Sequence, residues 1–546
     1  LMVLRKGLFW HYLEPCNLRP IVKEEYKEPC SRLYIRDKKT LLFEVTYYKK
    51  RINFEVFHVL TDGTGATEFL KELVKNYLYL AHKEEGLEQV ALLPEDMTVQ
   101  DQEDDSFLKY YSKDQKRPKK RKLNAFQIRR KKKDGNHLHV HESVVSVQAV
   151  LKRSRELGVS MTIFLTALFM MAINEEMSKM QKKKPVVLMV PVNLRKFFPS
   201  TSMLNFFNWI EPGYNFETQD KSFEAVLKYT KDFFESELTK EKMSAHISEL
   251  LALELHPILR LAPLELKNLC IQAGAKYSEK NTTAIFSNMS AVKMPESYVP
   301  YIERFGVYTN TPKLELCLCS FQDKLSFAFT SRYDTVNIER NFYRLLKEQG
   351  IISEKVKPEF PKTGKPSEQE MKVYKIYSFL CIAIVAAMLV MDLNFHPRIR
   401  WTLFTAGGVV TMWIASSIGF FKRYNLLKNA MWQLIIGTII CFIWDALTGW
   451  HSWSVDLVLP IMSVSTLAAM FVTAKVQKSP VREYLIYEIM AAGYGLILPV
   501  ILLLCGVVKN PTVSMFGALT CFLFLVAVIL FKGREFKEEM QKNLHV

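Results

Sequence analysis

The sequence predicts an α/β domain followed by an all-α membrane domain, and two observations lead to this prediction. Residues 1–373 are charged, and apolar strand-like runs in them alternate with helical patterns, which is typical of layered α/β domains. Residues 374–531 are mostly apolar and divide into segments long enough to cross a bilayer. At 546 residues the chain is also too long for one hydrophobic core, so we expect separate folding units.

Changes in composition divide the chain into six consecutive regions. A linker is indicated by Pro358, Pro361, Gly364 and Pro366, which precede the apolar half. The expected regions are a first lobe at 1–95, a charged connector at 96–136, the remainder of the α/β domain at 137–355, the linker at 356–373, the membrane domain at 374–532 and a tail at 533–546.

A strand–turn–helix unit is predicted in the first lobe. Residues 41–45 and 52–57 are rich in Val, Ile, Phe and Tyr, so they predict the two strands of a hairpin. The string His-Val-Leu-Thr-Asp-Gly follows at 58–63, and apolar residues then recur at helical spacing over 69–78. A His at the end of a strand is held rigidly, so His58 is a candidate general base; a buried structural His is the alternative.

The connector and the overall charge point to anionic partners. The chain carries 73 Lys and Arg against 56 Asp and Glu, a formal net charge of +17. The basic run over 113–133 fits either a contact with anionic lipid or coenzyme A phosphates, or a solvated loop. We expect no nucleic-acid partner, because no aromatic residues are interleaved with these charges.

We expect no metal site and no disulfide framework. His137, His139 and His141 alternate and would share one face of a strand, but zinc ligands confined to a single strand make a weak site, so a solvated strand face is favoured. The nine Cys are scattered without a Cys-x-x-Cys pair, which argues against a zinc ribbon. Cys317 and Cys319 alternate along a strand-like run, where we expect them to pack.

The rest of the α/β domain alternates helices and strands. Ser160 is expected to cap a helix whose apolar run, 161–173, is too short to span a bilayer and should therefore lie in the core. Further helices are predicted at 223–234 and 339–347, and strands at 186–192, 284–286 and 314–319.

The apolar half predicts a six-helix, multi-pass transmembrane domain in contact with membrane lipids. Most of its segments have the length that spans a hydrocarbon core of about 30 Å at about 1.5 Å per residue. The six segments are 376–395, 401–421, 430–449, 457–474, 484–508 and 512–531.

Charge sets the expected orientation of the membrane domain. Lys and Arg concentrate after the second, fourth and sixth segments, so both termini and the α/β domain should lie in the cytoplasm, at the inner (plasma) membrane. Asp445 and Glu488 fall in or near the predicted spans. An acid in a membrane segment is a functional-site candidate, and a paired structural acid is the alternative.

The His-x-x-x-Asp-Gly string at 58–63 resembles the motif of the chloramphenicol-acetyltransferase-like (HxxxDG) acyltransferase superfamily, most closely its bacterial alcohol acetyltransferases. Pro-Val-Asn-Leu-Arg at 191–195, with Asn-Phe at 205–206, is similar to the Arg-bearing strand and Gly-Asn turn of that family. Ser-Asn-Met-Ser at 287–290, followed by Met-Pro, is similar to its Ser-Asn-x-Gly…Pro strand.

The chain also departs from the family pattern. Many relatives have a second His where this chain has Phe57, and a Gly where it has Ser290. The Asp-Phe-Gly-Trp-Gly string of the plant enzymes is absent, which makes a plant-type substrate doubtful.

The resemblance covers residues 1–350 and implies a two-lobed, condensation-domain-like sandwich with a tunnel between its halves. It implies an opening strand and helix before Leu1, so we expect the sequence to be truncated at its N-terminus. It also implies roles for five residues. They are His58 as general base, Asp62 paired with Arg195 to hold the turn, Gly63 to keep the turn clear, and Ser287 as an oxyanion donor. For Ser287, a strand residue satisfied by backbone is an equal alternative.

The function that the resemblance implies is an acyl-CoA-dependent O-acyltransferase, expected to be an alcohol O-acetyltransferase. Acetyl-CoA or another acyl-CoA would be a co-substrate, with no permanently bound cofactor, and the acceptor a hydroxyl of an alcohol or a lipid-linked compound. One alternative is a catalytically inactive binding module, against which the intact His58, Asp62 and Arg195 argue. The other is a membrane transporter with an appended domain, but the membrane segments lack the broken helix pairs and central charges typical of transporters.

Overall fold

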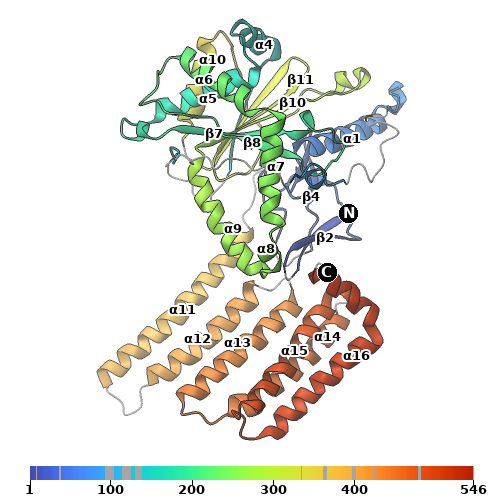
Figure 1. Cartoon of the computed structure of the whole chain (residues 1–546), viewed down its shortest axis with the longest axis vertical. Coiled ribbons are helices and arrows are strands. Elements are labelled where there is room, and N and C mark those ends of the chain that lie inside the picture. The colour runs from blue at the N-terminus through green and yellow to red at the C-terminus, as the bar shows by residue number, and fades with distance from the viewer. Residues whose placement is uncertain are drawn as a thin grey trace. The chain divides into compact units, whose positions relative to one another are not determined.

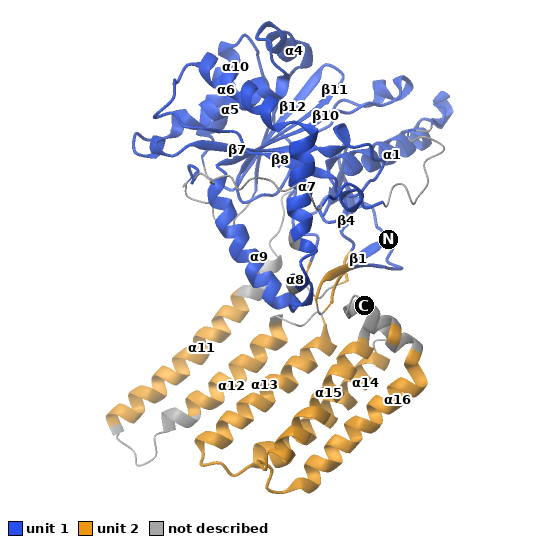
Figure 2. Ribbon diagram, viewed as in Figure 1, with its two compact units in different colours: residues 1–3, 13–34, 41–363 blue, residues 4–12, 35–40, 364–546 orange. Residues whose placement is uncertain are grey.

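A computed structural model describes most of the chain: residues 1–7, 9–35, 39–90, 92, 104–112, 124–128, 138–333, 335–360, 366–395, 401–421, 425–476 and 481–544. The chain divides into two compact units (Figure 2). Unit 1 comprises residues 1–3, 13–34 and 41–363, and unit 2 residues 4–12, 35–40 and 364–546. Most of the basic run over 113–133, and His137, lie outside the described residues.

The boundary between the units lies within the linker predicted at 356–373, but that linker is shorter than expected. Strand β13 extends to Val356, and helix α11 already begins at Pro366. Pro366 was interpreted as a linker residue because proline interrupts regular structure. Proline is nevertheless favoured at the first position of a helix, where its fixed φ fits and no N–H is needed.

Unit 1 is built on a mixed sheet with the strand order β13-β6-β12-β11-β10-β7-β8, and β9 pairs with β7. Strand β10 runs parallel to both of its neighbours, β7 and β11 (Figure 1). Strand β12 is antiparallel to β11 and β6. The strands are β6 (His139–Ser146), β7 (Val186–Asn193), β8 (Phe207–Ile210), β9 (Gly213–Tyr214), β10 (Ala284–Ala291), β11 (Leu314–Phe321), β12 (Lys324–Ser331) and β13 (Glu354–Val356).

The core of unit 1 lies between this sheet and its helices. Ser160 caps α5 (Met161–Glu176) by accepting a hydrogen bond from the backbone N of Ile163, and ten of the sixteen residues of α5 are buried, so the predicted core helix is confirmed. Phe169 on α5 contacts the rings of Phe286, Phe329 and Phe342. The other helices are α3 (Ser106–Lys109), α4 (Val147–Glu156), α6 (Phe223–Glu237), α7 (Lys240–Glu254), α8 (Pro257–Leu261), α9 (Leu264–Ser278) and α10 (Asn337–Glu348).

A smaller sheet precedes the His-x-x-x-Asp-Gly motif. Strands β4 (Phe43–Tyr48) and β5 (Arg51–Val56) form the predicted antiparallel hairpin, β3 (Lys23–Glu24) pairs with β4, and α1 (Gly63–Ala81) follows. Strands β1 (Met2–Lys6) and β2 (His11–Pro15) form a separate two-stranded sheet. Short 3₁₀ turns lie at Lys83–Glu85, Gln181–Lys183, Leu194–Lys196, Glu279–Asn281 and Glu296–Tyr301. The predicted α/β class is thus confirmed for unit 1.

Unit 2 is helical over its described residues from 366 onward. Its helices are α11 (Pro366–Phe395), α12 (Trp401–Phe421), α13 (Leu426–Leu447), the π-helical turn Ser454–Val458 that leads into α14 (Leu459–Val476), α15 (Val481–Leu504) and α16 (Pro511–Leu544), which is kinked at Lys532. Five stretches are long and apolar enough to cross a membrane: Lys372–Asn394, Leu426–Leu447, Ser454–Val476, Tyr484–Leu504 and Pro511–Gly533. In α12 the described apolar stretch, Thr405–Phe420, is shorter than a span, so the sixth crossing stays a prediction.

Asp445, at the end of α13, stabilises the turn that follows this helix. Its carboxylate accepts hydrogen bonds from the backbone N of His451 (2.7 Å) and Ser454 (3.0 Å) and from the Ser454 hydroxyl (2.7 Å). Asp456 binds the next connection in the same way, through the backbone N of Lys509 and Asn510. Of the two interpretations of Asp445, the structure therefore favours the paired structural acid.

Candidate active site

The His-x-x-x-Asp-Gly motif joins a strand to a helix through a short turn. Strand β5 ends at Val56, His58 follows in the turn, and α1 begins at Gly63. Asp62 is the N-cap of α1, because its Oδ1 accepts hydrogen bonds from the backbone N of Thr64 (3.0 Å) and Gly65 (3.2 Å). A side chain that binds these otherwise unpaired N–H groups fixes where the helix starts, and hence where the turn lies.

The second carboxylate oxygen of Asp62 binds a distant part of the chain. Arg195 donates from Nη1 to Asp62 Oδ2 at 2.6 Å, and the backbone N of Phe206 donates to the same oxygen at 2.9 Å. Both partners of the ion pair are largely buried, and they lie 133 positions apart in the sequence. The structure therefore contains the ion pair that the family resemblance implied.

Arg195 also binds the loop that follows β7. Its Nη2 donates to the carbonyl oxygens of Ser202 and Leu204, each at 2.7 Å, and its Nε donates to Ser202 at 3.1 Å. One planar guanidinium with five N–H groups can make several bonds of this kind at once. As a result, these hydrogen bonds fix the position of the loop over 202–206 relative to the turn over 58–62.

Asn205, at the centre of this loop, holds the imidazole of His58. Its Nδ2 donates to the carbonyl oxygens of His58 (2.8 Å) and Val59 (3.4 Å), so its Oδ1 must be the atom that lies 2.9 Å from His58 Nδ1. A carbonyl oxygen only accepts, so this assignment of the amide places a proton on Nδ1 and leaves Nε2 with a lone pair. His58 is exposed, and its ring lies 5.2 Å from that of Phe207 on β8.

The two glycines of the motif occupy crowded positions. A Cβ on Gly63 would lie 2.0 Å from Cε of Met289 on β10, so Gly63 lets the turn approach the central sheet. A Cβ on Gly65 would lie 2.4 Å from the carbonyl oxygen of Met203, which is backbone and cannot swing away. Of the two glycines expected to allow a tight turn, Gly65 is therefore the stricter requirement.

The Ser-Asn-Met-Ser stretch belongs to β10. Asn288 donates to Thr162 Oγ1 on α5 at 3.0 Å, so Ser287 and Met289 point to the opposite face, the one that Gly63 contacts. Ser287 is half-buried there, and its part as an oxyanion donor stays a prediction. Ser290 has φ +65°, a conformation that glycine adopts without strain, which fits the Gly that the family pattern implies at this position.

Buried ionisable side chains of β11 lie on the face of the sheet that carries Ser287 and Met289. Burial raises the pKa of Glu315, although a positive charge on His58 would lower it, so the two groups are within electrostatic range. Burial also raises the pKa of the Cys317 thiol well above its usual value, and the nearby Glu315 adds to the effect. A thiol held protonated in this way is a poor nucleophile, which fits the packing role expected for Cys317.

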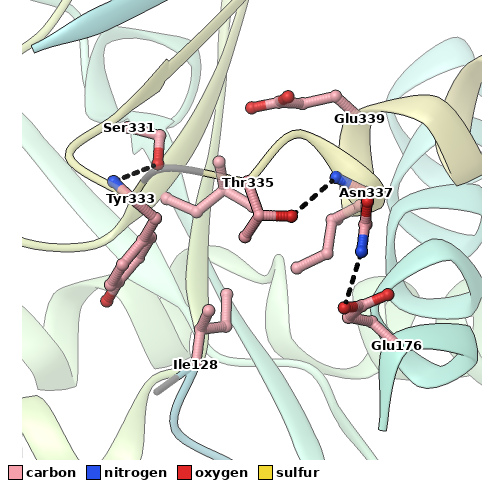
Figure 3. Close-up of a pocket in the computed structure, with 9 residues that line it drawn as sticks. Ile128, Glu176, Ser331, Tyr333, Thr335, Asn337 and Glu339 are labelled. Atoms are coloured by element: carbon pink, nitrogen blue, oxygen red, sulfur yellow. Dashed lines mark hydrogen bonds between the residues drawn. The ribbon is translucent and has the colours of Figure 1, made fainter. Parts of the chain in front are cut away.

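A small cleft lies elsewhere in unit 1, between α5, α10 and the end of β12 (Figure 3). Asn337 donates to Glu176 at 3.1 Å inside it, and burial raises the pKa of Glu339 to about 8. It is lined by Ile128, Glu176, Leu314, Ser331, Tyr333, Thr335, Asn337, Ile338 and Glu339. None of the predicted catalytic residues lines this cleft.

His139 and His141 do share a face of β6, with ring centroids 6.5 Å apart. Burial lowers the pKa of His141, so this imidazole is largely neutral at neutral pH. Among the described residues, no group of three or more His, Cys, Asp or Glu side chains is placed to hold a metal ion.

Comparisons with known proteins cover both halves of the chain. Residues 21–250 match the alcohol acetyltransferase family. Residues 360–546 match a family of unknown function, DUF6320. A search of curated protein sequences finds no match. The first match supports an acyltransferase, and it contains His58, Asp62, Gly63 and Arg195.

Three solved structures illustrate what the chain is similar to in fold. The epimerization domain from the third module of tyrocidine synthetase B is 12% identical, with a TM-score of 0.38 over 64% of this chain and 84% of that one. Polyketide synthase associated protein 5 from Mycobacterium tuberculosis is 12% identical (TM-score 0.40; 62% and 82%). Trichothecene 15-O-acetyltransferase from Fusarium sporotrichioides is 11% identical (TM-score 0.35; 57% and 70%).

Proposed function

We propose that the chain is an acyl-CoA-dependent alcohol O-acyltransferase in which His58 is the general base. The observation that carries this proposal is the orientation of His58. Asn205 binds Nδ1, so the basic Nε2 of an exposed imidazole is available to a substrate. The match of residues 21–250 to alcohol acetyltransferases supports the same reaction class.

The proposed reaction is a direct transfer with no acyl-enzyme. Nε2 of His58 takes the proton of the acceptor hydroxyl while the hydroxyl oxygen forms a bond to the thioester carbonyl carbon. When the carbon–sulfur bond breaks, the imidazolium returns the proton to the departing coenzyme A thiolate. The products are an ester and free coenzyme A, and His58 is regenerated.

Ser287 is the proposed donor to the tetrahedral oxyanion. It lies on the face of β10 that contacts the motif through Met289 and Gly63, and its hydroxyl is a donor of the required kind. Loss of one such donor typically lowers the rate by about 10²- to 10³-fold. Asp62 and Arg195 have no direct part in the chemistry; they position the turn that carries His58.

The membrane unit is proposed to hold the reaction at the cytoplasmic face of the inner membrane. Support comes from the five candidate spans and from the alternation of Lys- and Arg-rich loops along the sequence. Accessibility reporters in the tail after Lys532 and in the loop near His451 should therefore label from opposite sides. Labelling from the same side would contradict this orientation.

The reaction is tested with the full chain in lipid nanodiscs. Acetyl-CoA is incubated with a panel of short and long alcohols, and esters and free coenzyme A are measured by mass spectrometry. We expect one ester to accumulate together with an equal amount of coenzyme A. If no alcohol yields an ester and acetyl-CoA is only bound, the protein is a binding module and the proposal is wrong.

A further inference from the structure

Helices α7, α8 and α9 project from the sheet of unit 1, with α8 at the far end (Figure 1). Only the first turn of α9 is anchored: Leu264 and Lys267 are buried, and Lys267 Nζ donates to the carbonyl oxygen of Arg260 at 3.2 Å. All side chains from Leu269 to Lys280 are exposed. The last three turns of α9 are therefore not packed into the core of unit 1.

One side of the exposed helix α9 is apolar. Leu266, Leu269, Ala273 and Tyr277 recur at spacings of three and four residues, which places them in one stripe along the helix. Their large side chains are strongly exposed, with 53% for Leu266, 66% for Leu269 and 68% for Tyr277, and Leu261 of α8 is 75% exposed. An apolar stripe of this length in water is unfavourable and is typical of a surface that meets a partner or a membrane.

Helix α10 shows the usual arrangement in the same unit. Its apolar residues Ile338, Phe342, Leu345 and Leu346 are buried, and its charged residues Lys347 and Glu348 face outward. In α9, by contrast, the side chains from Leu269 onward are exposed on every face, so the described part of unit 1 leaves the apolar stripe uncovered. The exposure of α9 is thus a particular property of this helix and not of helices in unit 1 generally.

The chemistry around the stripe favours a lipid bilayer as its partner. The chain contains five candidate membrane spans, and only a short segment separates Thr363, the last residue of unit 1, from Lys372, where the first span begins. A segment of that length reaches at most about 30 Å even when extended, so unit 1 stays near a membrane surface.

Charge and residue type agree with this partner. The exposed charged residues over 257–281 are Arg260, Lys276 and Lys280 against two acids, Glu265 and Glu279, so the exposed surface of this segment has a net positive charge that suits anionic lipid headgroups. Tyr277 has the amphipathic ring that is enriched at the boundary between headgroups and acyl chains.

We propose that α8 and α9 form a second, non-spanning membrane contact, in which the apolar stripe lies in the interfacial layer of an anionic bilayer. Helices of this kind insert about 5–10 Å, to the boundary of headgroups and acyl chains. The contact would hold unit 1 in one orientation on the surface, in addition to the tether supplied by the spans.

Photo-crosslinking in the full chain tests this proposal. Benzoylphenylalanine replaces Leu269 or Tyr277, and the protein is placed in vesicles of phosphatidylcholine and phosphatidylglycerol. Ile352, which is 78% exposed and lies outside the stripe, is the matched control. After irradiation, mass spectrometry should find lipid adducts at positions 269 and 277 and none at 352.

The candidate spans keep every variant in the vesicle, so the adducts report on α9 alone. The double variant Leu266→Glu with Leu269→Glu should abolish most of the lipid adduct at position 277, because charged side chains disfavour insertion. Crosslinks from 269 and 277 to another part of this chain, or to a second copy, would identify a protein partner and overturn the proposal. An absence of any adduct at these positions would overturn it as well.

Discussion

Two buried aspartates, Asp62 in unit 1 and Asp445 in unit 2, both bind backbone N–H groups, but they connect different parts of the chain. Asp62 accepts two backbone N–H groups at the start of α1 and also pairs with Arg195, 133 positions away. Asp445 accepts two backbone N–H groups and a hydroxyl, all from residues 451–454, only six to nine positions away. One carboxylate joins remote segments, and the other closes a local turn.

The difference favours Asp62 over Asp445 as a residue of the proposed site. A local turn needs only hydrogen-bond donors, which the following residues supply. A catalytic turn must keep a fixed position relative to residues of another segment, and the Asp62–Arg195 pair fixes it relative to the loop that carries Asn205. A buried acid is therefore not by itself good support for a catalytic site, even in a membrane segment. Hydrogen bonds from that acid to residues far away in the sequence are stronger support.

The largest expected effect is the loss of the long-range pair. Asp62→Ala leaves Arg195 buried without its partner, which typically costs about 3–5 kcal/mol of unfolding free energy, and it also releases the turn. We expect a much lower thermal unfolding midpoint of unit 1, measured by differential scanning, together with loss of acyl transfer. A stable Asp62→Ala protein with normal turnover would show that the pair does not position the site.

A smaller loss is expected in the membrane unit. Asp445→Asn keeps the size of the side chain but weakens three bonds to N–H and O–H donors. Charge-assisted bonds contribute about 1.5–3 kcal/mol each at most. The unfolding midpoint should fall, whereas acyl transfer in nanodiscs should remain near the wild-type rate. A selective loss of transfer without a change in stability would return Asp445 to the list of functional candidates.

Asn205 contacts His58 through hydrogen bonds of an uncharged side chain, in contrast to the two aspartates. Asn205→Ala removes the acceptor for His58 Nδ1 together with the donor to the carbonyl oxygens of His58 and Val59. At about 1–1.5 kcal/mol for each bond lost, turnover should fall by roughly tenfold or more. Asn205→Asp keeps an acceptor and adds a negative charge, which stabilises the imidazolium. The acidic limb of its pH–rate profile should therefore move to higher pH, a shift that a purely structural role would not produce.

The smallest effect concerns backbone strain in the two regions. Ser290 and Ser452 both have positive φ, at 65° and 67°. Ser290→Gly should relieve strain and raise the unfolding free energy by up to about 1 kcal/mol, whereas the Ser452 hydroxyl donates to Asp456, so Ser452→Gly should gain nothing. Equal shifts in the two midpoints would contradict this distinction.

The sequence was sufficient for those features that depend on local patterns. The hairpin before His58, the cap at Ser160 and five of the six predicted spans carry their signals within a short stretch, and the structure agrees. The roles of Asp62 and Arg195 came from the resemblance, because nothing in their spacing connects them. Their contact is present, while the catalytic roles of His58, Gly63 and Ser287 remain predictions.

What the sequence did not predict depends on contacts between remote segments. The hydrogen bond of Asn205 to His58 and the approach of Met289 to Gly63 each join residues from different strands or loops. The position of β10 between β7 and β11 is a matter of long-range pairing as well. The exposed stripe of α9 follows helical spacing, but spacing alone cannot say that the apolar side faces outward.

The most direct test of the account is the turnover of His58→Ala beside wild type, measured as ester and coenzyme A formed by the full chain in nanodiscs. His58 is exposed, so its removal should leave the unfolding midpoint unchanged. The account predicts a rate lower by roughly 10²- to 10⁴-fold, as for the loss of a general base. A folded His58→Ala protein that forms ester at the wild-type rate would contradict it.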